Sequence, residues 1–143
     1  MTEVEFKRLA AQGFNRIPVV LETFADLDTP LSIYLKLANK PYSYLLESVQ
    51  GGERFGRYSF IGLASSTRIN VQGGTVLVLS GNRVAERSDS GDPLEFINGY
   101  LKRFKVAALP GLPRFCGGLV GCFGYDTVRY IEPRLAASTP PDT

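Results

Sequence analysis

Five short strand candidates follow one another closely between residues 42 and 88, and they restrict the fold more than any other feature of the sequence. These segments cover residues 42–48, 57–63, 67–72, 75–80 and 82–88. Gly73-Gly74 separates two of them by only two residues, and Gly81 lies in the next break, as hairpin turns require. Loops this short join antiparallel strands, because parallel strands need a long crossover connection. The sequence therefore predicts an antiparallel β-meander.

Helix signals lie on both sides of this meander. Phe6, Leu9 and Ala10 share one face of a helix that we predict over residues 3–12. Gly13 is expected to end this helix, because glycine readily adopts the left-handed conformation in which many helices end. The chain therefore begins with an amphipathic helix.

Two further helices begin with a capping residue followed by proline, at Thr29-Pro30 and Asp92-Pro93. The capping side chain accepts a hydrogen bond from a free backbone N–H, and proline suits the first helical position. Apolar residues then recur at helical spacing, first at Leu31, Tyr34, Leu35 and Ala38 and later at Leu94, Ile97, Leu101 and Phe104. We therefore predict the α+β class, an antiparallel β-meander sheet with two or three packed helices.

Two more segments are predicted as strands outside the meander. Residues 17–24 are β-branched and apolar, and residues 115–123 are apolar and punctuated by glycine. Glycines within a strand allow another backbone to approach closely. The glycines that we expect to act in this way are Gly117, Gly118, Gly121 and Gly124. They indicate a neighbouring segment that these 143 residues do not supply.

Cys116 and Cys122 are the only cysteines of the chain, which has no histidine. Two thiols without histidine do not make up a usual zinc site. On one strand the two residues would also lie too far apart for a disulfide. We predict that both are buried and act as small apolar residues.

The composition is that of an ordinary globular domain spanning residues 1–143, with 44% hydrophobic and 21% charged residues. The net charge of +2, with 16 basic residues spread along the chain, argues against nucleic-acid binding. No apolar run is long enough to span a membrane and no N-terminal signal pattern occurs, so we expect a cytoplasmic protein. Without histidine or a phosphate-binding glycine loop, the chain itself is predicted to be a binding or regulatory module.

Polar and aromatic residues meet where two neighbouring predicted strands are joined. The first strand ends in Leu46, Glu47 and Ser48, and the second begins with Arg57, Tyr58, Ser59 and Phe60. A carboxylate, a hydroxyl and a guanidinium together can hold both charged ends of a free amino acid. The aromatic residues would supply an apolar wall beside them.

A purely structural interpretation of the same residues stays open. Glu47 and Ser48 alternate in direction along a strand, so both reach one ligand only if the strand bends or ends there. Arg57 would otherwise be a surface charge, and Tyr58 and Phe60 would be core residues. The helix expected over 124–131 has a similar structural explanation. Its charged residues Asp126, Arg129 and Glu132 have the spacing of i,i+3 ion pairs.

Three segments, at residues 28–37, 45–62 and 117–132, resemble anthranilate synthase component I, a family of chorismate-utilising enzymes. The second carries Leu-Leu-Glu-Ser and later Gly-Arg-Tyr-Ser-Phe-Ile-Gly, and the third carries Gly-Gly-Leu-Val-Gly. Cys122 departs from the family, whose members often carry an aromatic residue there. The chain is also similar to the related aminodeoxychorismate synthase component I.

The resemblance implies a truncated N-terminal regulatory domain at residues 1–143 of a larger two-domain α/β-sandwich enzyme. That enzyme converts chorismate and glutamine-derived ammonia to anthranilate and pyruvate in tryptophan biosynthesis, with Mg²⁺ and a glutamine amidotransferase subunit, component II. The family's chorismate and Mg²⁺ residues belong to a C-terminal domain that nothing in this sequence matches. We therefore expect no catalytic residue, metal ligand or cofactor in this chain, and no activity from it alone.

The family resemblance also implies feedback inhibition by tryptophan. The residues implied to bind the inhibitor are Leu46, Glu47, Ser48, Arg57, Tyr58, Ser59 and Phe60. Because the family's pocket also uses residues of the C-terminal domain, we expect weak or no tryptophan binding by this chain alone. Where that domain would pack, apolar surface is exposed, so we also expect the chain to self-associate.

Three other functions remain open at this point. The chain could belong to the p-aminobenzoate branch of the same family, although its motifs favour the tryptophan branch. It could be a docking module for the glutaminase subunit, or an enzyme domain in its own right. The missing histidine and the missing catalytic segment argue against the last of these.

Overall fold

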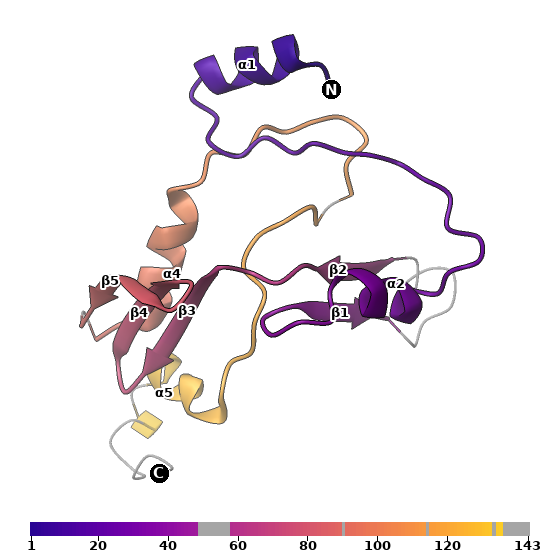
Figure 1. The fold of residues 1–143 in the computed structure, drawn as a ribbon. Helices are drawn as coiled ribbons and strands as arrows, with labels where there is room; N and C mark the ends of the chain where they lie inside the picture. Colours follow the sequence, from indigo (N-terminus) through magenta and orange to yellow (C-terminus); the bar gives the residue numbers. More distant parts are fainter. Residues whose placement is uncertain (49–57, 90, 114, 133, 136–143) are drawn as a thin grey trace. The chain divides into compact units, whose positions relative to one another are not determined.

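The computed structural model describes residues 1–48, 58–89, 91–113, 115–132 and 134–135 (Figure 1). Its elements in chain order are α1 (Glu3–Ala11), α2 (Pro30–Leu37), β1 (Tyr44–Glu47), β2 (Ser59–Gly62), β3 (Thr67–Gln72), β4 (Thr75–Ser80), β5 (Arg83–Ser88), α4 (Pro93–Lys102), the 3₁₀ helix η1 (Tyr125–Thr127) and α5 (Val128–Ile131). The predicted α+β class is confirmed, as are the five strands of the meander and the helices at both ends. None of the helices in the described ranges is long and apolar enough to cross a membrane.

The strands form two antiparallel sheets, one of β1 and β2 and one in the order β3-β4-β5. Glycines make the turns of the larger sheet possible. Gly73 and Gly74 have φ values of 55° and 86°, and Gly81 has a φ of 59°. These values lie in the left-handed region, where a side chain is strained, so the turns need glycine.

By its internal contacts the chain divides into two compact units, which are described separately. The first unit comprises Met1–Leu21, Val71–Val76 and Ser88–Thr143. The second comprises Glu22–Asn70 and Leu77–Arg87.

In the first unit, Asn15 joins the segment after α1 to the segment after α4. Its side-chain amide donates a hydrogen bond to the Arg103 carbonyl at 2.7 Å, and its Oδ1 accepts one from the Lys105 N–H at 2.7 Å. The next residue, Arg16, forms an isolated parallel bridge with Val106. These contacts hold two extended segments side by side, although they lie about 90 positions apart in the sequence.

Helix α4 begins where its sequence predicts. The Asp92 carboxylate accepts hydrogen bonds from the N–H groups of Leu94 and Glu95, both at 3.0 Å. Such a cap satisfies backbone donors that have no partner within the helix. The ring of Tyr100 on this helix lies 6.3 Å from that of Phe96 and 5.4 Å from that of Phe104, which follows the end of the helix. The cap and this aromatic row make α4 a well-specified element.

The strands predicted at 17–24 and 115–123 are wrong. Both segments lack regular pairing, and a single bridge at Arg16 adjoins the first of them. β-Branched composition favours a strand only where a neighbour offers a hydrogen-bonding edge, and the described part of the chain offers none here. Many of the apolar side chains are left uncovered, with Leu21 90% and Phe24 94% exposed.

The predicted burial of Cys116 and Cys122 is also wrong, because both cysteines are exposed. The prediction assumed a packed strand at 115–123, and without that strand the thiols have no cover. A Cβ placed on Gly117, Gly121 or Gly124 would meet no described atom within 4 Å. The close backbone neighbour expected at these glycines therefore does not come from the described residues.

Few hydrophobic side chains are buried in either unit. Among the residues that the structure places, they are Leu9, Val76 and Ala107 in the first unit and Ala38 and Val78 in the second. Val76 and Val78 alternate along β4, as expected for the central strand of three. The apolar stripe of α2 is only partly covered, since Leu31 and Leu35 on it are 53% and 55% exposed. Much apolar surface therefore remains uncovered.

Candidate functional site

The hairpin of β1 and β2 brings most of the predicted site residues together. Its antiparallel register pairs Tyr44 with Gly62, Leu45 with Ile61, Leu46 with Phe60, and Glu47 with Ser59. Residues directly opposite each other share one face of the hairpin. Leu46 and Phe60 therefore lie side by side on one face, and Glu47 and Ser59 lie on the other.

Burial changes from one end of this hairpin to the other. Tyr44 and Gly62 are partly buried, whereas Glu47 and Ser59 at the opposite end are exposed. Leu46 is 46% exposed. The end that carries the predicted site residues is thus the accessible one.

The polar side chains at this end lie near one another. Ser59 Oγ is 3.5 Å from Glu47 Oε1, a long hydrogen bond. Strand β1 ends at Glu47, and Ser48 follows it as an exposed residue. Because the strand ends at Glu47, the alternation of side chains along a strand does not fix the direction of Ser48. The side chains of Glu47 and Ser48 can therefore both approach one ligand.

Two aromatic rings lie at the start of β2. The ring centroids of Tyr58 and Phe60 are 6.2 Å apart, with 35° between the ring planes. Tyr58 is 55% exposed, and Phe60 is partly buried. This separation is within the range in which aromatic pairs attract each other, so the two rings can act as one apolar surface.

Arg57, the predicted cation, lies outside the described residues, as does the glycine loop that carries Gly51, Gly52 and Gly56. The structure therefore places six of the seven predicted site residues. These are Leu46, Glu47, Ser48, Tyr58, Ser59 and Phe60.

Helix α2 supports the hairpin by contacting both of its strands. The Tyr34 hydroxyl, on α2, lies 3.0 Å from Ser43 Oγ, directly before β1. Within the hairpin, the ring of Tyr44 occupies the space beside Gly62, so that a Cβ at that glycine would collide with it. A tyrosine ring and a glycine opposite each other thus set the packing of the covered end.

Asp28 holds the beginning of α2. Its Oδ1 accepts a hydrogen bond from Ser32 Oγ at 2.7 Å and forms an ion pair with Lys36 Nζ at 2.5 Å. The hydrogen bonds from Lys36 and then from Ser32 lower the pKa of Asp28 from 3.8. Thr29 and Ser32 complete a reciprocal cap of the helix. These contacts are structural and lie outside the predicted site.

The ion pair predicted near the end of the chain forms. Arg129 Nε lies 2.7 Å from Asp126 Oδ1, at the expected i,i+3 spacing. Arg129 Nη1 also donates a hydrogen bond to the Leu135 carbonyl at 3.1 Å, and Glu132 Oε1 accepts one from the Arg134 N–H at 3.3 Å. The contacts stabilise the chain around η1 and α5 locally, which agrees with the structural interpretation.

Two residues next to the hairpin were missed by sequence reasoning. The predicted strand began at residue 42, but β1 begins at Tyr44, and Tyr42 lies in a turn. The Arg68 guanidinium lies over the Tyr42 ring, 3.8 Å from its centroid. Pro41 is the sequence signal for the turn, since proline favours its second position. No sequence signal could have revealed the contact with Arg68.

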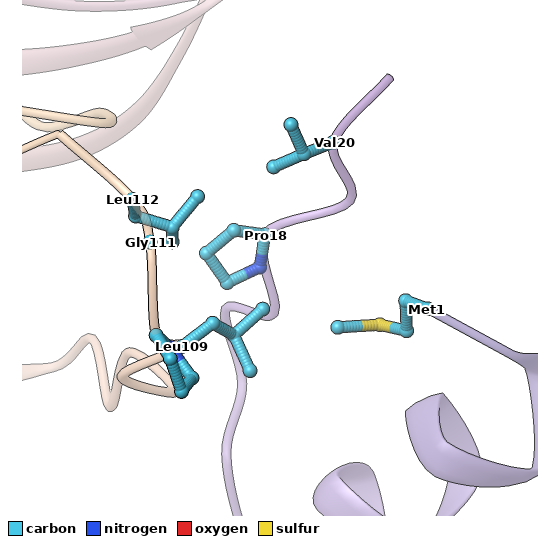
Figure 2. A pocket seen from close by; sticks show the side chains of 7 residues that line it. Met1, Pro18, Val20, Leu109, Gly111 and Leu112 are labelled. Atoms are coloured by element: carbon cyan, nitrogen blue, oxygen red, sulfur yellow. The ribbon is translucent and has the colours of Figure 1, made fainter. Parts of the chain in front are cut away.

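A separate hollow in the first unit was also not predicted (Figure 2). It is lined by Met1, Pro18, Val20, Leu109, Pro110, Gly111 and Leu112. None of these side chains is ionisable, so the hollow has no charged side chain that could orient a ligand. The hairpin end is therefore the better candidate site.

Comparison with known proteins identifies close relatives along the whole chain. The chain is 61% identical over 142 residues to anthranilate synthase component 1 of Pseudomonas putida, a match that covers 99% of this chain and 29% of the relative. It is 58% identical to the protein of that name from Pseudomonas aeruginosa, with the same coverage. Anthranilate synthase component 1 of Acetivibrio thermocellus is 40% identical over 125 residues, which are 87% of this chain and 25% of the relative.

No family model matches the chain, and no solved structure is significantly similar to it. The Pseudomonas relatives carry the same name, and they align with 99% of this chain at 58–61% identity. The chain therefore belongs to the anthranilate synthase component 1 family, and it spans about 29% of the length of the first relatives.

Proposed function

We propose that this chain forms the regulatory part of an anthranilate synthase component 1. The full-length protein would convert chorismate and glutamine-derived ammonia to anthranilate and pyruvate in tryptophan biosynthesis. The 61% identity to the Pseudomonas putida protein of that name supports this proposal. Chorismate, Mg²⁺ and the catalytic groups would be held by the part of the polypeptide that this chain does not span.

We further propose that the accessible end of the β1–β2 hairpin binds tryptophan as an inhibitor. One observation carries this proposal: Leu46 and Phe60 form an apolar pair at the same exposed end at which Glu47 faces Ser59. The Glu47 carboxylate is suited to the ligand's ammonium group, because charge-assisted hydrogen bonds are the stronger ones. An indole ring suits the apolar face formed by Phe60 and Tyr58. Because Glu47 lies on the opposite face, the ligand would lie across the end of the hairpin and reach both faces there.

Ser48 and Arg57 complete the proposed site. The Ser48 hydroxyl, directly after β1, can donate to or accept from a polar group of the ligand. Arg57 would bind the ligand's carboxylate, since a guanidinium binds a carboxylate through two parallel hydrogen bonds. Together with Glu47 these groups would recognise a free amino acid by both of its charged ends.

Inhibition would operate through a shift between two conformations. Tryptophan would stabilise an arrangement of the full-length protein that binds chorismate poorly. Thermodynamic linkage then requires that chorismate weaken tryptophan binding by the same factor. Competition between the two ligands is therefore expected even though they occupy different sites.

The exposed segments 17–24 and 115–123 would pack against the remainder of the full-length polypeptide. Most of their apolar side chains are exposed, and relatives of this chain are more than three times as long. The chain alone is then expected to self-associate through this surface. A monomer at high concentration in analytical ultracentrifugation would count against this proposal.

A Ser48→Phe substitution in the full-length protein tests the inhibitor site. The phenyl ring would occupy the space of the ligand, and overpacking of this kind costs about 1–3 kcal/mol, or roughly 5- to 150-fold in affinity. We expect the tryptophan concentration for half-inhibition to rise by about this factor while uninhibited turnover stays the same. The measurement is anthranilate fluorescence over a tryptophan titration.

Ser48→Ala serves as the matched control, because it removes the hydroxyl without filling space. Unchanged tryptophan sensitivity of Ser48→Phe would show that the inhibitor binds elsewhere. Identification of the reaction product in the same assay tests the proposed activity. Formation of an aminodeoxychorismate product would place the protein in the p-aminobenzoate branch instead.

A further inference from the structure

Tyr42 occupies a turn position that normally requires glycine. The Ser43 N–H donates a hydrogen bond to the Lys40 carbonyl at 3.3 Å, which closes a β-turn with Pro41 and Tyr42 at its centre. Tyr42 has a φ of 65°, the left-handed value that the third residue of a type II turn adopts. It is the one non-glycine residue with a positive φ in the ranges that the structure describes. A large side chain in this conformation is strained and needs compensation from its surroundings.

Arg68 on β3 supplies this compensation. Its guanidinium lies 3.8 Å from the centroid of the Tyr42 ring, within the range of a cation–π contact. Arg68 Nη2 also donates a hydrogen bond to the Gly81 carbonyl at 2.6 Å, in the turn between β4 and β5. The guanidinium therefore joins Tyr42 to two places in the three-stranded sheet.

The backbone of Tyr42 is held as well. Its carbonyl accepts a hydrogen bond from the Ser65 N–H at 3.1 Å, and the Ser66 carbonyl accepts one from the Gly81 N–H at 2.6 Å. All of these residues belong to the same compact unit. We call Tyr42 and Arg68, together with these hydrogen bonds, the tyrosine clamp.

The position of the tyrosine clamp relates it to the proposed site. Tyr42 lies two positions before the start of β1, and Ser65 follows β2 after a short gap, so the clamp closes the base of the hairpin. Glu47 and Ser59 lie at the other end of the same two strands. Each of the two strands is only four residues long, so the clamp at the base fixes the orientation of the opposite end, which carries Glu47 and Ser59.

We propose that Tyr42 and Arg68 are positioning residues for tryptophan inhibition: the ring of one and the guanidinium of the other fix the β1–β2 hairpin against the three-stranded sheet in the arrangement that binds the inhibitor. This inference rests on the proposed tryptophan site. Neither residue touches the ligand. They act by raising the population of the binding-competent arrangement, since apparent affinity falls with the fraction of molecules that adopt it.

The expected effect is moderate and specific. A cation–π contact at a partly exposed site corresponds to about two- to five-fold in an equilibrium constant. Removing the ring or the guanidinium is therefore expected to raise the half-inhibiting tryptophan concentration by about that factor. The turnover number and the KM for chorismate without tryptophan stay unchanged, because the clamp does not belong to the catalytic machinery.

The test uses the full-length protein and compares variants of both partners. Tyr42→Leu removes the aromatic face, whereas Tyr42→Phe keeps it and is expected to keep wild-type sensitivity. Arg68→Gln removes the cation, and Arg83→Gln, on β5 of the same sheet, is the matched control. The double variant Tyr42→Leu with Arg68→Gln is expected to be about as sensitive to tryptophan as Arg68→Gln alone, because both changes remove the contact between the ring and the guanidinium.

The outcomes separate this inference from the function on which it rests. A wild-type protein that tryptophan does not inhibit would overturn both. If the wild type is inhibited and both Tyr42→Leu and Arg68→Gln keep its sensitivity, the clamp is overturned and the inhibitor site stands. Equal losses in Tyr42→Phe and Arg83→Gln would also overturn the clamp, since a general loss of stability would then explain the data.

Discussion

The strands from β1 to β5 and the two segments at 17–24 and 115–123 were all predicted as strands, but they have different structures. Both groups contain β-branched residues, and the two segments are the more apolar group. The former pair into two antiparallel sheets, whereas the latter have one isolated bridge beside them, between Arg16 and Val106. Composition alone does not separate the two groups.

The difference lies in how each strand reaches its partner. Gly73-Gly74 and Gly81 bring β3, β4 and β5 together across tight turns, so the partner is close in sequence and chain closure costs little. The bridge beside 17–24 is parallel, and parallel strands are usually found in sheets buried on both faces. Apolar composition therefore predicts a strand only together with a partner that can be identified nearby.

Hydrogen exchange is expected to show the largest difference between the two groups. In this chain alone, amides of β4 would be protected by about 1,000-fold or more, as in a cooperatively folded core. Amides of 19–24 would exchange without protection. In the full-length protein, protection of 19–24 is expected to appear if the segment packs against the remainder of the polypeptide as proposed. Absence of protection there would contradict the proposed packing of this segment.

A pair of valine substitutions gives the next largest effect. Val76 on β4 is fully buried, and Val20 in the extended segment is 60% exposed. Val76→Ala is expected to destabilise the chain by about 2 kcal/mol, whereas Val20→Ala stays within about 0.5 kcal/mol. Chemical denaturation of this chain measures both values. Similar losses for the two variants would show that Val20 is packed after all.

The pH dependence of Asp28 gives the smallest effect and concerns the helix that supports the hairpin. Hydrogen bonds from Lys36 and Ser32 lower its pKa in the folded protein below 3.8. A carboxylate with a lowered pKa stabilises the fold above the unfolded value, and this contribution is lost as the pH falls through the folded value. We therefore expect Asp28→Asn to be less stable than the parent above pH 3.8 and to converge with it at lower pH.

A carboxyl titration of Asp28 followed by NMR provides a direct check. A midpoint at or above 3.8 would contradict the hydrogen-bonded arrangement at the start of α2. Asp26→Asn is the matched control, because this neighbouring acid lies outside the network of Lys36 and Ser32.

Sequence reasoning succeeded where a local signal was present. Thr29 and Asp92 marked helix starts through their capping chemistry, and Gly73-Gly74 and Gly81 marked the turns. It failed at 17–24 because apolarity does not reveal whether a partner strand exists. It also failed at Tyr42, whose conformation is stabilised by Arg68, 26 positions further along the chain. Contacts of this range depend on the tertiary fold and leave no local pattern.

The candidate site was predicted in part from residue types and in part from family resemblance. Alternation along a strand placed Glu47 and Ser48 in different directions, and the pairing of β1 with β2 then set Glu47 opposite Ser59. That pairing depends on the register of the hairpin, which the sequence did not specify. Tryptophan binding at this end stays a prediction.

The most direct measurement is a tryptophan titration of thermal stability in the full-length protein, with this chain measured in parallel. A ligand that binds the native state raises the Tm by mass action. We predict that tryptophan stabilises the full-length protein, that Glu47→Ala abolishes this effect, and that the chain alone responds weakly or not at all. Stabilisation that survives the Glu47→Ala change, or no stabilisation of the wild type, would contradict a tryptophan site at the accessible end of the β1–β2 hairpin.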